Sequence, residues 1–156
     1  MNNNVKPVPE GRHTVTPYLI VKNASDAIEF YKKAFGAEEV FRMAVPGAQV
    51  GHAELRIGDS LIMLADEAPQ MGAHSPESMG GTPVSIVLYV EDADALTNQA
   101  IAAGARLTRP VKDQFYGDRM GTLTDPFGQI WHIATHKEDV SPEEISKRAK
   151  ALFGVV

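Results

Sequence analysis

The chain has 156 residues, of which 44% are hydrophobic and 22% charged, as is typical of one globular domain with a sizeable core. It contains no cysteine, which excludes a disulfide scaffold, a thiolate zinc site, an iron–sulfur cluster and a cysteine nucleophile. The net charge of -5 argues against nucleic-acid binding, because contact with phosphates needs a concentrated basic surface, and it mildly favours a cationic partner.

The first twelve residues are polar and are interrupted by proline and glycine, so we expect a disordered lead-in over 1–12. They lack the apolar stretch of a secretory signal. No apolar run approaches the roughly 18 residues of a membrane span. These features predict a cytoplasmic protein that binds no membrane.

Two halves of the chain repeat one order of elements. From Thr14, an apolar run leads to a helical pattern that starts near Asn23 or Ser25 and stops at Gly36. Extended segments are then predicted over 38–45, 50–57 and 60–66.

The second half begins at Thr82, and its helix runs from Asp92 to Gly104. Its three extended segments cover 105–111, 118–124 and 129–136, with a type I turn signature at 125–128. Each half therefore predicts β-α-β-β-β, in modules 13–66 and 83–136.

Between the modules, residues 67–82 are rich in Gly, Pro, Ser and Met and show no periodicity. A loop of this length is usually functional or disordered, so the segment is either a lid over a pocket or a linker. The tail 137–156 carries Ser141 at an N-cap, Pro142 at the first helical position and Glu144 two residues later, which predicts a helix over about 141–153. Its narrow apolar stripe indicates docking on the body or on a second subunit.

Two β-α-β-β-β modules, together with FYKKAFGAEE, HAELRIGDSLIML and YGDRMGTLTDPFGQIWHIATH, resemble the vicinal oxygen chelate superfamily. Residues 13–136 resemble one domain of its glyoxalase/bleomycin-resistance/dioxygenase branch, and within it the PhnB-like proteins. The resemblance implies an α+β fold in which two tandem βαβββ modules curve their sheets into a cup, with helices outside and ligand inside. It also implies a homodimer, as is common among such relatives.

Enzymes of this superfamily hold a divalent metal with residues from the first and last strand of each module. Matching the halves to that pattern places Thr16, Ile62, Ser85 and His132 at those positions, and only His132 is a competent ligand. One imidazole cannot hold such a metal against water. We therefore expect no metal cofactor, although a displaced site of His52, Glu54 and His132 remains an alternative.

The polar face of the 50–57 strand, which carries His52, Glu54 and Arg56, would look into the cup, although a surface salt-bridge cluster explains it as well. His132 is either a pocket base or ligand contact, or a histidine satisfied within its sheet. His136 lies four residues further along a strand, about 13 Å away, and is expected at the surface. The candidates for ligand contact are Tyr18, His52, Glu54, Arg56, Tyr89, Tyr116, Arg119 and His132.

Two classes of function follow from these residues. The missing metal ligands favour a protein that binds or sequesters a small molecule, similar to the bleomycin-resistance proteins. The alternative is an enzyme of the lyase, isomerase or dioxygenase type. It would use either the displaced metal site or acid/base catalysis by His132 with Tyr116. The sequence leaves open whether any reaction is catalysed.

Overall fold

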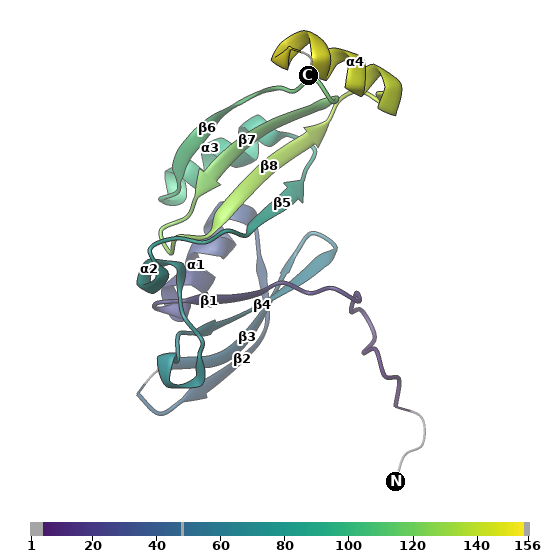
Figure 1. The fold of residues 1–156 in the computed structure, drawn as a ribbon. Helices are drawn as coiled ribbons and strands as arrows, with labels where there is room; N and C mark the ends of the chain where they lie inside the picture. Colours follow the sequence, from purple (N-terminus) through teal and green to yellow (C-terminus); the bar gives the residue numbers. More distant parts are fainter. Residues whose placement is uncertain (1–4, 48, 155–156) are drawn as a thin grey trace. The chain divides into compact units, whose positions relative to one another are not determined.

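A computed structural model describes residues 5–47 and 49–154. The chain divides into two compact units, residues 1–81 and 82–156, and Figure 1 labels the elements of both. Each unit contains one four-stranded sheet. Within the described residues, no helix has both the length and the apolar character required to cross a membrane.

The first unit contains one complete β-α-β-β-β module. Its sheet has the order β1-β4-β3-β2, in which β1 runs parallel to β4 and the other pairs are antiparallel. A 3-10 turn and a short helix follow the last strand. Its elements are β1 (Tyr18–Val21), α1 (Ala24–Phe35), β2 (Glu38–Val45), β3 (Gln49–Ile57), β4 (Ser60–Asp66), η1 (Pro69–Met71) and α2 (Pro76–Met79).

The second unit repeats this topology with the order β5-β8-β7-β6, and it ends in an additional helix. The α+β class and the tandem βαβββ arrangement predicted from the sequence are confirmed. Its elements are β5 (Ser85–Tyr89), α3 (Ala93–Ala103), β6 (Arg106–Asp113), β7 (Asp118–Thr124), β8 (Ile130–His136) and α4 (Pro142–Phe153).

Local capping explains where the helices begin and end. Asn23 adopts a left-handed conformation with φ 57°, and its side chain accepts a hydrogen bond from the backbone N–H of Asp26, so Asn23 rather than Ser25 caps α1. Asp92 caps α3 through the N–H of Ala95. Ser141 caps α4 through the N–H of Glu144. The predicted starts of all three helices are confirmed to within one or two residues.

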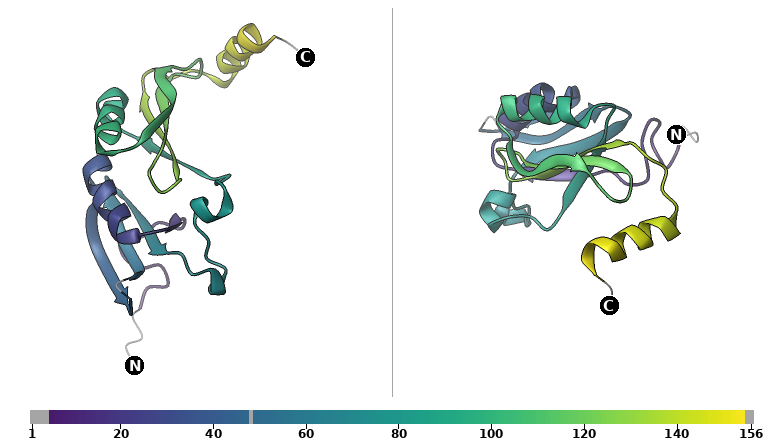
Figure 2. Two further views of the ribbon diagram at one scale, coloured as in Figure 1. Left: turned by 90° about the vertical axis from the view of Figure 1, so that its left-hand side faces the viewer. Right: turned by 90° about the horizontal axis from the view of Figure 1, so that it is seen from above.

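Each sheet buries one face against the helix of its own unit, as Figure 2 shows for α1 and α3. In the first unit, fully buried side chains come from both the helix and the strands: Val21, Ile28, Tyr31, Leu55 and Leu64. In the second unit they are Leu123, Trp131 and Ile133. These cores leave the opposite face of each sheet free for polar side chains.

Residues 67–82 have more structure than their composition indicates. The carboxylate of Glu67 accepts hydrogen bonds from the N–H and hydroxyl of Ser75 and from the hydroxyl of Ser78, at 2.7–3.1 Å. These bonds lower the pKa of Glu67 to about 2. The segment is thus tied to the end of β4, and it carries η1 and α2 rather than forming one irregular loop.

Candidate functional site

A row of hydrogen-bonded polar side chains lies on the sheet face of the first unit that points away from α1. Tyr18 Oη lies 2.8 Å from His52 Nδ1, and His52 Nε2 lies 3.3 Å from Glu54 Oε1. The other oxygen of Glu54 accepts a hydrogen bond from Arg12 Nη2 at 2.5 Å. Arg56 follows on the same side of β3 by strand alternation. The structure therefore brings together the predicted residues Tyr18, His52 and Glu54.

The sequence places Arg12 in the lead-in, yet its side chain forms an ion pair with Glu54. Burial raises the pKa of the Glu54 carboxyl, but the hydrogen bonds from Arg12 and His52 outweigh it and leave this pKa below its usual value. Glu54 is consequently an ionised, nearly buried group with partners in place.

The strand register corrects one position of the expected metal site. Tyr18 pairs with Met63 across β1 and β4, and Val87 pairs with His132 across β5 and β8. Met63 is therefore the counterpart of His132, whereas Ile62 is buried on the α1 side of the sheet. A one-residue shift of register reverses the face of every side chain, and the sequence repeat alone did not resolve it.

His132 is held between two hydroxyl groups on the sheet face of the second unit. Its Nδ1 lies 2.9 Å from Thr122 Oγ1, and its Nε2 lies 3.0 Å from Ser85 Oγ. Burial and the positive charge of Arg109 lower the pKa of His132. The lowered pKa favours the neutral form of the ring, and both of its nitrogens have a hydroxyl within hydrogen-bond distance.

Arg119 lies on the opposite face of its sheet from His132. Its guanidinium donates to both oxygens of Asp94 on α3, at 2.6 and 2.9 Å, and to Asp113 at 3.1 Å. Asp118 and Arg119 are neighbours in β7 and so point to opposite faces. The structure thus separates Arg119 from the other candidates, and Arg119 fastens α3 to the sheet instead.

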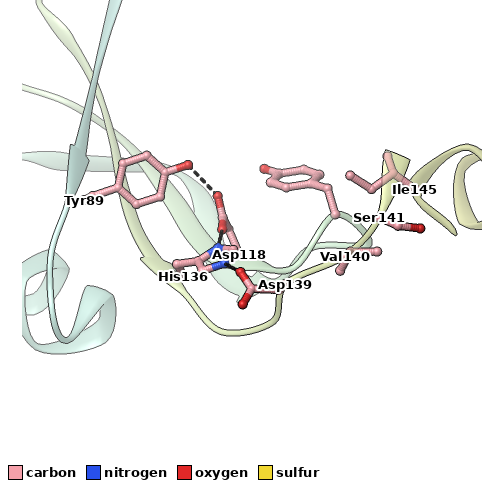
Figure 3. A pocket seen from close by; sticks show the side chains of 8 residues that line it. Tyr89, Asp118, His136, Asp139, Val140, Ser141 and Ile145 are labelled. Atoms are coloured by element: carbon pink, nitrogen blue, oxygen red, sulfur yellow. Dashed lines mark hydrogen bonds and ion pairs between the residues drawn. The ribbon is translucent and has the colours of Figure 1, made fainter. Parts of the chain in front are cut away.

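A pocket of about 520 Å³ opens in the second unit where β5, β7 and β8 meet the start of α4 (Figure 3). At its base, Asp118 Oδ2 accepts a hydrogen bond from Tyr89 Oη at 2.7 Å, and Asp118 Oδ1 lies 2.7 Å from His136 Nδ1. His136 Nε2 lies 2.8 Å from Asp139. The residues that line the pocket are Tyr89, Tyr116, Asp118, His136, Asp139, Val140, Ser141 and Ile145.

Sequence reasoning found only part of this pocket. The sequence predicts Tyr89 and Tyr116 as ligand contacts, whereas it predicts His136 only as a surface residue, with which its exposed ring agrees. The segment over 139–145 was not expected to contribute. The one sequence feature that could have indicated this contribution is the glycine at position 117. Gly117 has φ 107°, and its carbonyl oxygen accepts backbone hydrogen bonds from Lys137 and Glu138 at 2.9 and 3.0 Å.

These backbone bonds fix the chain between β8 and α4 beside the start of β7. Arg148 of α4 then donates to the backbone carbonyl of Phe115 at 3.2 Å and pairs with Glu138 at 2.8 Å. The rings of Phe115 and Phe153 meet edge to face with centroids 5.7 Å apart. Together, these contacts hold α4 as one wall of the pocket.

The donor groups do not fit a divalent metal at the superfamily's positions. Thr16 and Ser85 offer hydroxyls, Met63 offers a thioether, and His132 alone offers a strong ligand. Among residues 5–47 and 49–154, no three His, Asp or Glu side chains are grouped so that they could hold a metal ion. His52 and Glu54 lie in the first unit and already pair with Tyr18 and Arg12.

The repeated βαβββ unit with a polar sheet face is the architecture of one large class of proteins. The family model of the Glyoxalase/Bleomycin resistance protein/Dioxygenase superfamily matches residues 12–133, and the chain belongs to this superfamily. It is 44% identical over 134 residues to an uncharacterised protein of Mycobacterium tuberculosis, covering 84% of this chain and 79% of that protein.

Two solved structures show the same fold. A gene product of Arabidopsis thaliana aligns with a TM-score of 0.61 and 28% identity, over 78% of this chain and 98% of that one. The PhnB protein of Bacillus cereus aligns with a TM-score of 0.61 and 18% identity, over 79% and 99% of the two chains. The second likeness concerns the fold alone and agrees with the resemblance to PhnB-like proteins.

Proposed function

We propose that the chain is a small-molecule-binding member of its superfamily that works without a divalent metal. The pocket of about 520 Å³ in the second unit is the observation that carries this proposal. Its volume lies within the range of small-ligand sites, roughly 300–1,000 Å³. Apolar, aromatic and charged side chains converge on it, and this mixture supplies both contact area and orientation for a ligand.

The chemistry of the strand positions supports independence from a metal. A metal at Nε2 of His132 would have to displace the hydroxyl of Ser85, and the side chain beside Nδ1 offers only another hydroxyl, that of Thr122. Catalytic sites normally supply three strong protein ligands and one open position. These residues would therefore lose a divalent ion to water.

Elemental analysis of the purified protein, paired with thermal melting in the presence of Mn²⁺, Fe²⁺, Ni²⁺ or Zn²⁺, tests the metal-free state. A ligand that binds only the folded chain raises its melting temperature by mass action. We expect no stoichiometric metal and no rise. One metal per chain with a clear rise that His132→Ala abolishes would overturn the proposal.

The second candidate function is acid/base catalysis by His132. The lowered pKa of His132, caused by burial and by Arg109, supports it, because it favours the neutral imidazole, which can accept a proton. Tyr116 gives less support as its partner, since its hydroxyl donates to Met120 Sδ at 3.8 Å and burial raises its pKa. If His132→Gln retains ligand affinity but loses turnover, the result favours an enzyme. If the natural chain and His132→Gln bind the ligand equally and neither turns it over, the result favours a binding protein.

A further inference from the structure

We propose that the pocket beside α4 binds a small organic cation, an alkylamine or a quaternary ammonium group. This inference rests on the proposed binding function and specifies the class of ligand. It follows from the carboxylate at the base of the pocket, the surplus of negative charge around it and its two aromatic side chains.

Asp118 supplies a carboxylate that is built into the base of the pocket. Its side chain is only 8% exposed, and its two oxygens are oriented by Tyr89 and His136. Because these contacts already fix the Asp118 side chain, it loses little conformational entropy when a cation binds.

The surrounding charges leave the pocket negative. His136 lies between the carboxylates of Asp118 and Asp139, so even a protonated ring offsets only one of the two (Figure 3). Two arginines of this unit pair with carboxylates that do not line the pocket: Arg119 pairs with Asp94 and Asp113, and Arg148 pairs with Glu138 and Glu144. An incoming cation therefore enters a negative potential.

Aromatic and apolar side chains complete the site. Tyr89 donates its hydroxyl hydrogen to Asp118, which leaves the face of its ring free for contact. Tyr116 lines the same pocket together with Val140 and Ile145. Tyrosine rings attract ammonium groups through their quadrupole, and apolar neighbours suit the alkyl carbons that such groups carry.

The start of α4 does not favour an anion in this pocket. Pro142 has no N–H group, and the N–H of Glu144 is already bonded to the hydroxyl of Ser141. Glu143 and Glu144 add negative charge to the first turn. The helix end that lines the pocket thus reinforces the preference for a cation.

Titration of the ¹⁵N-labelled full chain with choline, followed by amide NMR, tests the proposal. The matched control ligand is 3,3-dimethylbutan-1-ol, which has the same shape without the charge. We expect choline to bind saturably, to shift the amides of Tyr116, Asp118 and Ser141, and to bind about tenfold or more tightly than the alcohol, given typical ion-pair and cation–π contributions.

Two pairs of variants locate the effect. Asp118→Asn removes the buried charge at constant shape and should weaken choline binding about tenfold or more, whereas Asp113→Asn, outside the pocket, should not. Tyr116→Phe keeps the ring and should retain affinity, whereas Tyr116→Leu should reduce it severalfold. Thermal melting verifies that each variant is folded. If Asp118→Asn does not fold, the comparison of Tyr116→Phe with Tyr116→Leu still tests the proposal.

The possible outcomes separate this inference from the proposed function. Equal affinity for choline and the neutral alcohol overturns the cation preference. Binding of benzoate or benzyl alcohol with shifts at the pocket, but no binding of choline, overturns the inference and leaves a ligand-binding pocket in place. Failure of all four compounds at millimolar concentration overturns the inference and removes the pocket as support for the proposed function.

Discussion

Gly117 and Glu138 lie in such close contact that any side chain on the glycine would overlap the carbonyl oxygen of Glu138. The carbonyl of Gly117 also accepts the N–H of Glu138 at 3.0 Å. This contact joins the turn before β7 to the segment after β8. It therefore places Asp139, Ser141 and the start of α4 around the pocket.

Gly117→Ala should destabilise the protein by about 1–3 kcal/mol, because alanine disfavours φ 107° and its Cβ would collide with Glu138. Gly80→Ala is the matched control, with φ 80° and no neighbouring atom within 4 Å of an added Cβ. Urea unfolding of both variants measures the difference. Equal losses would mean that backbone conformation alone, and not the contact with Glu138, sets the requirement for glycine.

Asp125→Ala should lower the free energy of unfolding by about 2–4 kcal/mol, because it leaves several N–H donors in the core of the second unit without an acceptor. The buried Asp125 carboxylate accepts the indole N–H of Trp131 at 2.9 Å and the backbone N–H groups of Phe127 and Gln129 at 2.8 and 3.0 Å. Asp59→Ala, in the exposed turn between β3 and β4, should stay within about 0.5 kcal/mol. Denaturant unfolding with Trp131 fluorescence measures both, and similar losses would contradict the assigned role of Asp125.

Ser75→Ala should destabilise the protein by about 1 kcal/mol or more, because it removes both the N-cap of α2 and a hydrogen bond to Glu67. The same change should raise the pKa of Glu67 from about 2 toward its ordinary value. Carboxyl NMR titration and urea unfolding provide the two measurements. Ser60→Ala, an exposed serine, is the control, and an unchanged Glu67 pKa in Ser75→Ala would rule out this network.

His136 should make stability depend on pH. Hydrogen bonds to Asp139 and Asp118 raise the pKa of His136 in the folded chain, so its contribution is complete below the unfolded pKa of about 6.5 and is lost as pH rises through the higher folded value. The same titration should strengthen choline binding at higher pH. Melting curves from pH 5.5 to 8.5 for the natural chain and His136→Gln should converge at the alkaline end, and parallel curves would contradict the prediction.

Much of the fold could be predicted because local sequence encodes it. Asn23, Asp92 and Ser141 supply cap oxygens, and the expected strands 38–45, 60–66 and 118–124 coincide with β2, β4 and β7. Strand alternation also placed His52 and Glu54 on one face. The homodimer, the ligand and the cytoplasmic setting stay predictions.

The amino-acid sequence by itself determined the order of the elements and the repeat, because capping and periodicity act over a few residues. Only the tertiary structure decided which residues meet across the sheets. The strand register makes Met63, and not Ile62, the counterpart of His132. The side chain of Arg119 contacts α3, and the carboxylate of Asp118 contacts His136 and Tyr89. A shift of one residue reverses a strand's faces, and contacts between distant segments depend on register and backbone approach, which local patterns do not encode.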